Sequence, residues 1–154
     1  MRRDSRLSGV LHVLLHMAEM EGPVTSETMA AIMGSNPATM WRTMAGLRKA
    51  GFVRSDKGHG GGWSIERPLS DVTLRDIYTW LDSPELFAMG NRTEAPGCLV
   101  EEAVNAALGS AYDEARGVLL DRFASLTLAQ LSDDFHRRMG AHAEAVDQEI
   151  TDDA

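Results

Sequence analysis

One predicted helix ends and the next begins within three residues, between Gly34 and Pro37. Asn36 is a good N-cap, and Pro37 suits the first helical position because its missing N–H has no partner to lose there. Met40 and Leu47 share one face of the second helix, which we expect to run to about residue 50. Two helices joined by so short a turn predict a helix-turn-helix.

The segment before this turn also reads as two helices. Apolar residues at helical spacing predict a helix over Leu7–Ala18, which Gly22-Pro23 would end. A short helix then begins at Thr25, a good N-cap, with Val24 and Met29 spaced as a hydrophobic staple.

A glycine-rich segment, residues 57–62, separates two short predicted strands at residues 52–56 and 63–67. Its four glycines let the backbone adopt positive φ and approach another surface closely. A hairpin directly after a helix-turn-helix is a wing. The sequence therefore predicts a mainly α fold with a small β-hairpin wing, that is, a winged helix-turn-helix plus a long dimerisation helix.

The second half of the chain is predicted to be helical. Thr73–Asp76 resembles a capping box, and a loop at 83–97 follows the helix that it opens. A long helix should span Leu99 to about Ala124. Its stripe of small and apolar residues should pair with a second copy, and it consists of Val100, Val104, Ala107, Ala111, Ala115 and Val118.

A second capping box at Thr127–Gln130 opens the last helix, with Leu128, Leu131, Phe135 and Met139 expected to point inward. We divide the chain into a DNA-binding domain at 1–82, a loop at 83–97, dimerisation helices at 98–140 and a frayed acidic tail at 141–154.

Charge is distributed unevenly along the 154 residues. Residues 1–68 carry nine basic and six acidic side chains, whereas residues 69–154 carry six basic and seventeen acidic ones. The basic footprint expected of a nucleic-acid partner thus lies in the N-terminal half, despite a net charge of −8. We find no signal peptide and no apolar run long enough to cross a membrane, so we expect a cytoplasmic protein.

Several segments in order resemble the Rrf2 family, the winged-helix repressors that include the iron-sulfur cluster regulator and the nitric-oxide-sensitive repressor. They are residues 36–44, 47–53, 58–63, 73–78 and 127–131, and the resemblance covers roughly residues 5 to 135. It implies a dimer held by the long helix and a role in sensing redox, iron-sulfur or related stress.

The chain also departs from the family pattern. Cluster-binding members have three cysteines before the long helix, and this chain has only Cys98 there. It is more similar to the thiol-type branch, in which Leu11-His12 and a lone cysteine also recur. We therefore expect no cofactor. At Trp41 many relatives have arginine, so whether this chain reads the same base pattern as those relatives stays open.

Candidate contacts to double-stranded DNA lie on the helix-turn-helix and the wing. They are Ser26, Asn36, Pro37, Ala38, Thr39, Trp41, Arg42, Arg48, Lys57, His59 and Gly60. Arg2, Arg3, Arg6, Lys49 and Arg54 are further candidates for contacts to backbone phosphate. The alternative for these residues is an ordinary solvated face with no DNA contact. If a two-fold dimer reads the DNA, the operator would be palindromic.

His12 and His16 have the spacing of a helical metal pair, but we interpret both as histidines set among core leucines and expect no metal. A cluster held between two subunits by Cys98 and a histidine of the first helix stays an open alternative. Cys98 itself is a candidate redox-responsive thiol, because the positive end of the long helix favours thiolate, although Glu101 and Glu102 oppose this. The alternative is a small buried residue that packs the loop.

No nucleophile elbow, phosphate loop or paired carboxylates on a cleft indicate catalysis, so we do not expect an enzyme. We expect a DNA-binding transcriptional regulator, a repressor, that responds to redox state through Cys98. Two alternatives are a winged helix that makes only protein contacts and a regulator that senses a small ligand.

Overall fold

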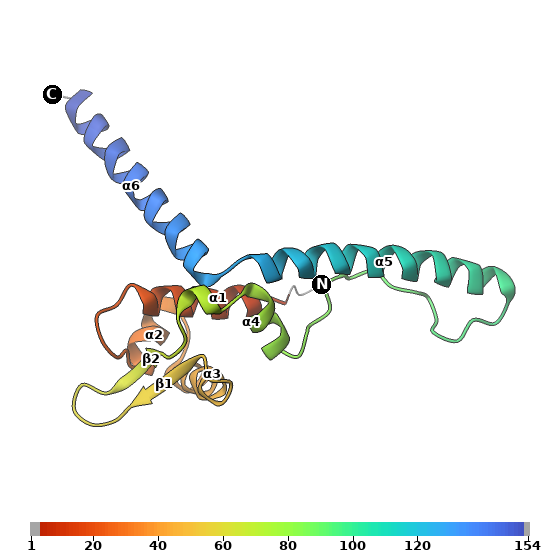
Figure 1. Cartoon of the computed structure of the whole chain (residues 1–154), viewed down its shortest axis with the longest axis horizontal. Helices are drawn as coiled ribbons and strands as arrows, with labels where there is room; N and C mark the ends of the chain where they lie inside the picture. The colour runs from red at the N-terminus through yellow and green to blue at the C-terminus, as the bar shows by residue number, and fades with distance from the viewer. Residues whose placement is uncertain (1–3, 153–154) are drawn as a thin grey trace.

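The computed structural model describes residues 4–152, with side chains described as far as residue 145 (Figure 1). A compact N-terminal head carries the wing, and two long helices project from it in different directions. This confirms the predicted fold class. In chain order the elements are α1 (Arg6–Ala18), α2 (Ser26–Met33), α3 (Pro37–Lys49), β1 (Val53–Asp56), β2 (Gly62–Ile65), the 3₁₀ turn η1 (Leu69–Asp71), α4 (Leu74–Trp80), α5 (Leu99–Ser125) and α6 (Leu128–Asp152).

The helix-turn-helix forms where the N-caps predict it. The Thr28 amide donates to Thr25 Oγ1 at 3.1 Å, and the Thr39 amide donates to Asn36 Oδ1 at 2.8 Å. Gly34, with φ of +60°, ends α2 in the left-handed conformation that glycine adopts without a Cβ clash. These local bonds fix the start of α3 relative to α2.

The core of the head comes from one face of each helix together with the base of the wing. The largest fully buried side chains are Leu14, Met29, Met44, Leu47, Ile77, Leu128 and Val53. Because Leu128 belongs to α6, the start of the last helix is part of this core. Main-chain bonds from Leu74 to Leu126 and from Leu128 to Val72, both at 2.9 Å, hold that junction against the head.

The wing is a two-stranded antiparallel hairpin in which Ser55 pairs with Trp63 and Asp56 with Gly62. Gly62 therefore belongs to β2 and not to the loop, and the strand ends at Ile65 and not at 67. The reason is a close main-chain contact: Val24 and Trp63 exchange hydrogen bonds at 2.9 and 2.8 Å. A Cβ on Gly62 would lie 2.7 Å from the Val24 carbonyl oxygen, so only glycine fits there.

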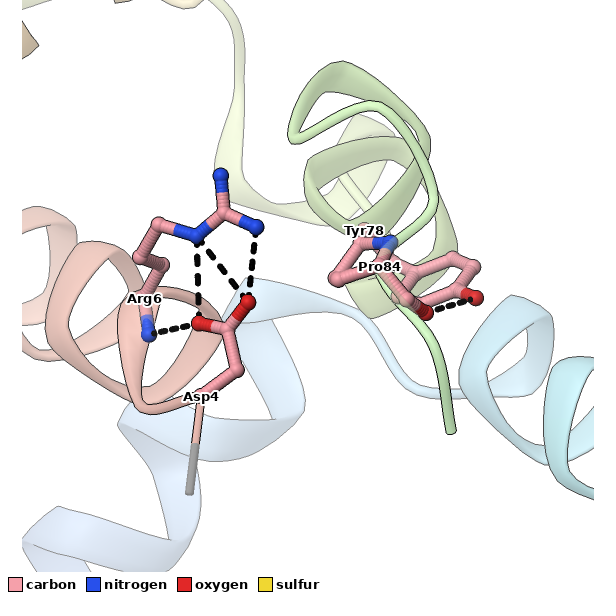
Figure 2. A network of polar contacts seen from close by, with 4 residues as sticks. All are labelled: Asp4, Arg6, Tyr78 and Pro84. Atoms are coloured by element: carbon pink, nitrogen blue, oxygen red, sulfur yellow. Dashed lines mark hydrogen bonds and ion pairs between the residues drawn. The ribbon is translucent and has the colours of Figure 1, made fainter. Parts of the chain in front are cut away.

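The α4–α5 connection leaves the head and runs out beside α5 before the helix turns back (Figure 1). The predicted capping box at the start of α4 is present, with Thr73 and Asp76 each accepting the other's amide hydrogen. At the exit of the helix the Tyr78 hydroxyl donates to the Pro84 carbonyl at 2.7 Å (Figure 2). This bond ties the first residues of the loop to the head.

Two expectations for α6 are wrong. Phe135 and Met139 point outward, with 42% and 53% of their surface exposed, because α6 projects away from the head (Figure 1). The tail expected to fray from residue 141 instead continues the helix to Asp152. That stretch has no proline or glycine and is rich in alanine, glutamate and glutamine, which favour helix.

Candidate nucleic-acid interface

The first two turns of α3 present one side to the core and the other side to solvent. Met40, Met44 and Leu47 face the core and are at most 5% exposed. The remaining faces of these turns are therefore free, and the predicted contact residues Pro37, Ala38, Thr39, Trp41 and Arg42 are all exposed. Trp41 is notable because 57% of its surface meets solvent, whereas a tryptophan is more often packed.

Asn36 and Thr39 also have local roles at this end of the helix. The Asn36 carboxamide oxygen is used by the N-cap, and the Thr39 hydroxyl oxygen accepts a weak 3.5 Å bond from the Arg42 guanidinium. Arg42 has no carboxylate partner among the described residues. Its remaining N–H groups are available to an acceptor outside the chain.

Ser26 differs from the prediction that it contacts DNA. It is only 7% exposed, and its hydroxyl oxygen accepts a 3.0 Å hydrogen bond from the indole Nε1 of Trp63. The bond joins the start of α2 to the wing, 37 residues further along the chain. Ser26 therefore positions the wing against the helix-turn-helix, and its side chain is not an exposed contact.

The tip of the wing carries Lys57, His59 and Gly60, all exposed as predicted. Gly58 and Gly60 have φ of +95° and +76°, which explains why the tip needs glycine. Arg54, by contrast, lies back along β1. Its guanidinium bonds to Asp56 at 3.3 Å and to Glu66 at 3.4 Å, and these hydrogen bonds raise its pKa.

A hollow of about 450 Å³ opens between α3 and the wing, and we call it the α3–wing hollow. The residues that line it include Trp41 and the acidic residues Glu27 and Asp56. The hydroxyl of Ser64 donates to Asp56 at 2.5 Å, and this bond, with that from Arg54, keeps the pKa of Asp56 below its ordinary value. Asp56 is therefore ionised at neutral pH.

The other predicted phosphate contacts differ in exposure and in pairing. Arg48 and Lys49 are exposed at the far end of α3. Arg6 forms a fork of hydrogen bonds with Asp4, the shortest at 2.7 Å, so its charge is already paired (Figure 2). These bonds hold the pKa of Asp4 at about 2. Arg2 and Arg3 lie outside the described residues.

Cys98 is the N-cap residue of α5 and is exposed, so the alternative of a buried packing residue is not what the structure shows. The segment before it is fastened to the helix. The Glu101 carboxylate accepts the Gly97 amide at 2.8 Å and the Arg92 guanidinium at 2.6 Å, and both bonds lower the pKa of Glu101. The negative charge closest to the thiol in sequence is thus partly neutralised by Arg92.

His12 and His16 do not lie among core leucines. His12 is exposed, His16 is half-buried, and their Nε2 atoms are 2.9 Å apart. No group of three histidine, cysteine or acidic side chains suited to a metal ion occurs within the described residues.

The exposed start of α3, set beside a glycine-tipped wing, defines a winged helix-turn-helix, the fold of a class of DNA-binding regulators. The comparison with family models agrees: residues 3–134 match the Rrf2 model, described as an iron-dependent transcriptional regulator. The chain belongs to the Rrf2 family of transcriptional regulators.

Individual relatives share the fold along most of the chain. YwnA of Bacillus subtilis, named as an HTH-type transcriptional regulator, is 27% identical over 126 residues, which are 81% of this chain and 92% of that protein. CymR, the global cysteine regulator of B. subtilis, superposes with a TM-score of 0.64 at 22% identity over 86% of this chain and 98% of its own. IscR of T. potens superposes with a TM-score of 0.61 at 22% sequence identity, over 87% of this chain and 88% of its own.

The iron in the family description does not fit this chain as a cluster held by several cysteines. The whole sequence has one cysteine, Cys98, which is exposed, and no group of three or more histidine, cysteine or acidic side chains suited to a metal ion occurs in the described part of the chain. Nor does any described helix have the length and apolar character that a membrane crossing requires.

Proposed function

We propose that this protein is a homodimeric, cytoplasmic repressor that binds a palindromic operator through α3 and the wing, has no catalytic activity and responds to oxidants at Cys98. The observation that carries the proposal is the exposed start of α3, with Thr39, Trp41 and Arg42 free of the core. A helix end of this kind fits the major groove, and the wing tip then meets backbone or minor groove.

Dimerisation through α5 is supported by the two unlike faces of that helix. One face is half-buried against the 83–97 loop and the head, through residues such as Asn105, Tyr112 and Phe123. The opposite face is the predicted stripe, in which Val100, Val104 and Val118 are 50–73% exposed. Alanines between these valines would let a second helix approach closely, and burial of the stripe would remove this apolar surface from water.

A two-fold axis at α5 would present two heads to the DNA about one turn, roughly 34 Å, apart. The operator would then be a palindrome with half-sites at that spacing. We place the reading domain at 1–82, the connecting loop at 83–97 and the dimerisation helices from 98, extending beyond 140 because α6 is continuous.

Cys98 is the proposed point of redox control, because its thiol is exposed at the N-terminus of the dimer helix. Peroxide would convert the thiol to a sulfenic acid, with release of water. Attack on that sulfenic acid by the thiol of a second chain would release another water and join the two chains by a disulfide. Cys98 lies at the end of α5 remote from its own head (Figure 1), about 40 Å along a helix of 27 residues. A signal from it must therefore pass through the α5 interface.

The experiment is selection of duplexes from a random DNA library by reduced wild-type protein, followed by affinity measurements on the selected operator. Wild type and Cys98→Ser are each compared before and after mild peroxide. We expect a palindrome to be enriched, and peroxide to change the affinity of wild type alone. Enrichment of no duplex would contradict DNA reading, and equal affinity in all four samples would contradict control at Cys98.

A further inference from the structure

The exposed residues at the start of α3 are of two chemical kinds. Thr39 and Arg42 carry hydrogen-bonding groups, whereas Pro37, Ala38 and Trp41 present mainly carbon. Trp41 lies four residues after Pro37 and three after Ala38, so the three share one side of the helix. We call them the apolar strip.

The fold does not need Trp41 on this strip. The core face of α3 is complete with Met40, Met44 and Leu47, and the indole of Trp41 remains 57% exposed beside it. A large apolar side chain exposed to water does not gain the free energy of burial. Contact with an apolar group on the DNA would supply that free energy on binding.

The major groove offers one such group. Purine edges and cytosine present hydrogen-bond donors and acceptors, whereas thymine adds a C5-methyl group. We infer that Trp41 is a specificity-determining residue that recognises the C5-methyl group of one thymine in each half of the operator. This inference rests on the proposed function, because it requires α3 to lie in the groove.

The surroundings of Trp41 favour a base edge over the sugar-phosphate backbone as its partner. The α3–wing hollow beside the indole is lined in part by two acidic residues, Glu27 and Asp56. Asp56 is hydrogen-bonded to Arg54 and Ser64, and Glu27 has no ion-pair partner within the described part of the chain. A phosphate placed at this hollow would face negative charge, so the strip is better suited to the floor of the groove.

The expected size of the effect follows from burial of one methyl group. Loss of one such contact should weaken binding about fourfold in each half-site, and about fifteenfold when both half-sites lose it. Uracil is the exact probe of this contact, because it pairs like thymine and lacks only the methyl group.

The test begins with an operator enriched from random duplexes by wild-type protein. Each thymine of the operator is then replaced by uracil, symmetrically in both half-sites, and affinity is measured for wild type, Trp41→Ala and Trp41→Phe. Met89→Ala is the matched control, because Met89 is 74% exposed on the 83–97 loop. Thermal melting and circular dichroism establish that each variant is folded.

We expect one thymine position at which uracil weakens wild type and Met89→Ala about fifteenfold and Trp41→Ala less than twofold, with Trp41→Phe between them. If no uracil substitution changes wild-type affinity, or if the loss persists in Trp41→Ala, the inference is wrong while DNA reading stands. Failure of the wild type to enrich any duplex would overturn the DNA-binding proposal, and this inference with it. If Trp41→Ala does not fold, the wild-type and Trp41→Phe measurements decide.

Discussion

The head buries most of its large apolar side chains, whereas α5 leaves most of its own exposed. Among the described residues, every buried apolar side chain except Leu128 lies between Val10 and Leu81. α5, with 27 residues, is the longest helix in the part of the chain that the structure describes, and it has no buried residue. The head has therefore completed its core within one chain, whereas α5 still exposes the surface that a core would use.

This difference separates two tasks. The head can fold around Leu14, Met44 and Ile77 and hold α3 in a fixed position whether or not a partner is present. α5 needs a second surface to bury its stripe, and in the proposed dimer a second copy of the chain would supply a matching one. Substitutions in the head should accordingly affect folding or reading, and substitutions on the stripe should affect assembly.

The largest effect is expected from Ala111→Arg, at the centre of the exposed α5 stripe. A long cation there cannot be buried between two close helices, so the dimer should dissociate. Operator affinity should fall by about 10² to 10⁴, because the two heads no longer bind as a linked pair. Sedimentation velocity measures the mass, and Asp113→Arg, on the opposite side of the helix, should remain a dimer.

Leu47→Ala tests the head. Leu47 is fully buried in α3, and its truncation should cost about 2–5 kcal/mol of unfolding free energy. Val118→Ala, on an exposed residue of α5, should change the stability of the head by less than about 0.5 kcal/mol. Urea unfolding of Leu47→Ala and Val118→Ala, each made in the monomeric Ala111→Arg background, measures the two losses of unfolding free energy. Equal losses would contradict the separate roles of the head and α5.

A smaller effect is expected from Arg42→Ala, which removes a guanidinium from the reading helix. Loss of a paired base contact should cost about 1–3 kcal/mol on the best sequence and relax the preference at one position. Arg137→Ala removes an exposed arginine from α6 and should leave the selected operator unchanged. The same loss on every duplex would instead mean that Arg42 contacts phosphate.

The smallest effect is expected at the loop before α5. The pKa of Glu101 is lowered in the folded chain, so its bonds to Gly97 and Arg92 contribute stability at neutral pH that is lost as the pH falls through the ordinary glutamate range. Glu101→Gln should reduce the hydrogen-exchange protection of the Gly97 amide at pH 7 severalfold. Glu102→Gln, at the next residue, should not.

Local signals predicted most of the head. The N-caps at Thr25 and Asn36, the capping boxes at Thr73 and Thr127 and the glycine-rich tip are each encoded within a few residues, and all are present. The exposure of Ala38, Thr39 and Arg42 also followed from helical spacing, because the core face of α3 was evident in the sequence.

The errors concern contacts between distant residues. Ser26 is a small polar residue at a helix start, and nothing nearby in sequence indicates its bond to Trp63. Arg54 is neutralised partly across the hairpin by Glu66. Phe135 and Met139 have the spacing of a buried face, but whether that face is covered depends on the direction in which α6 leaves the head. The N-caps set where helices begin and leave such directions open.

The central claim is that the head reads DNA while α5 pairs two heads on one operator. Sedimentation equilibrium of the selected palindrome with the reduced protein measures the stoichiometry directly, and a salt titration by fluorescence anisotropy measures the electrostatic contribution. We predict two chains per duplex and weak binding to a single half-site. We also predict that the affinity falls steeply with salt, with a slope of log K against log salt concentration of about −0.9 for each neutralised phosphate. One chain per duplex, or equal affinity for palindrome and half-site, would contradict the account.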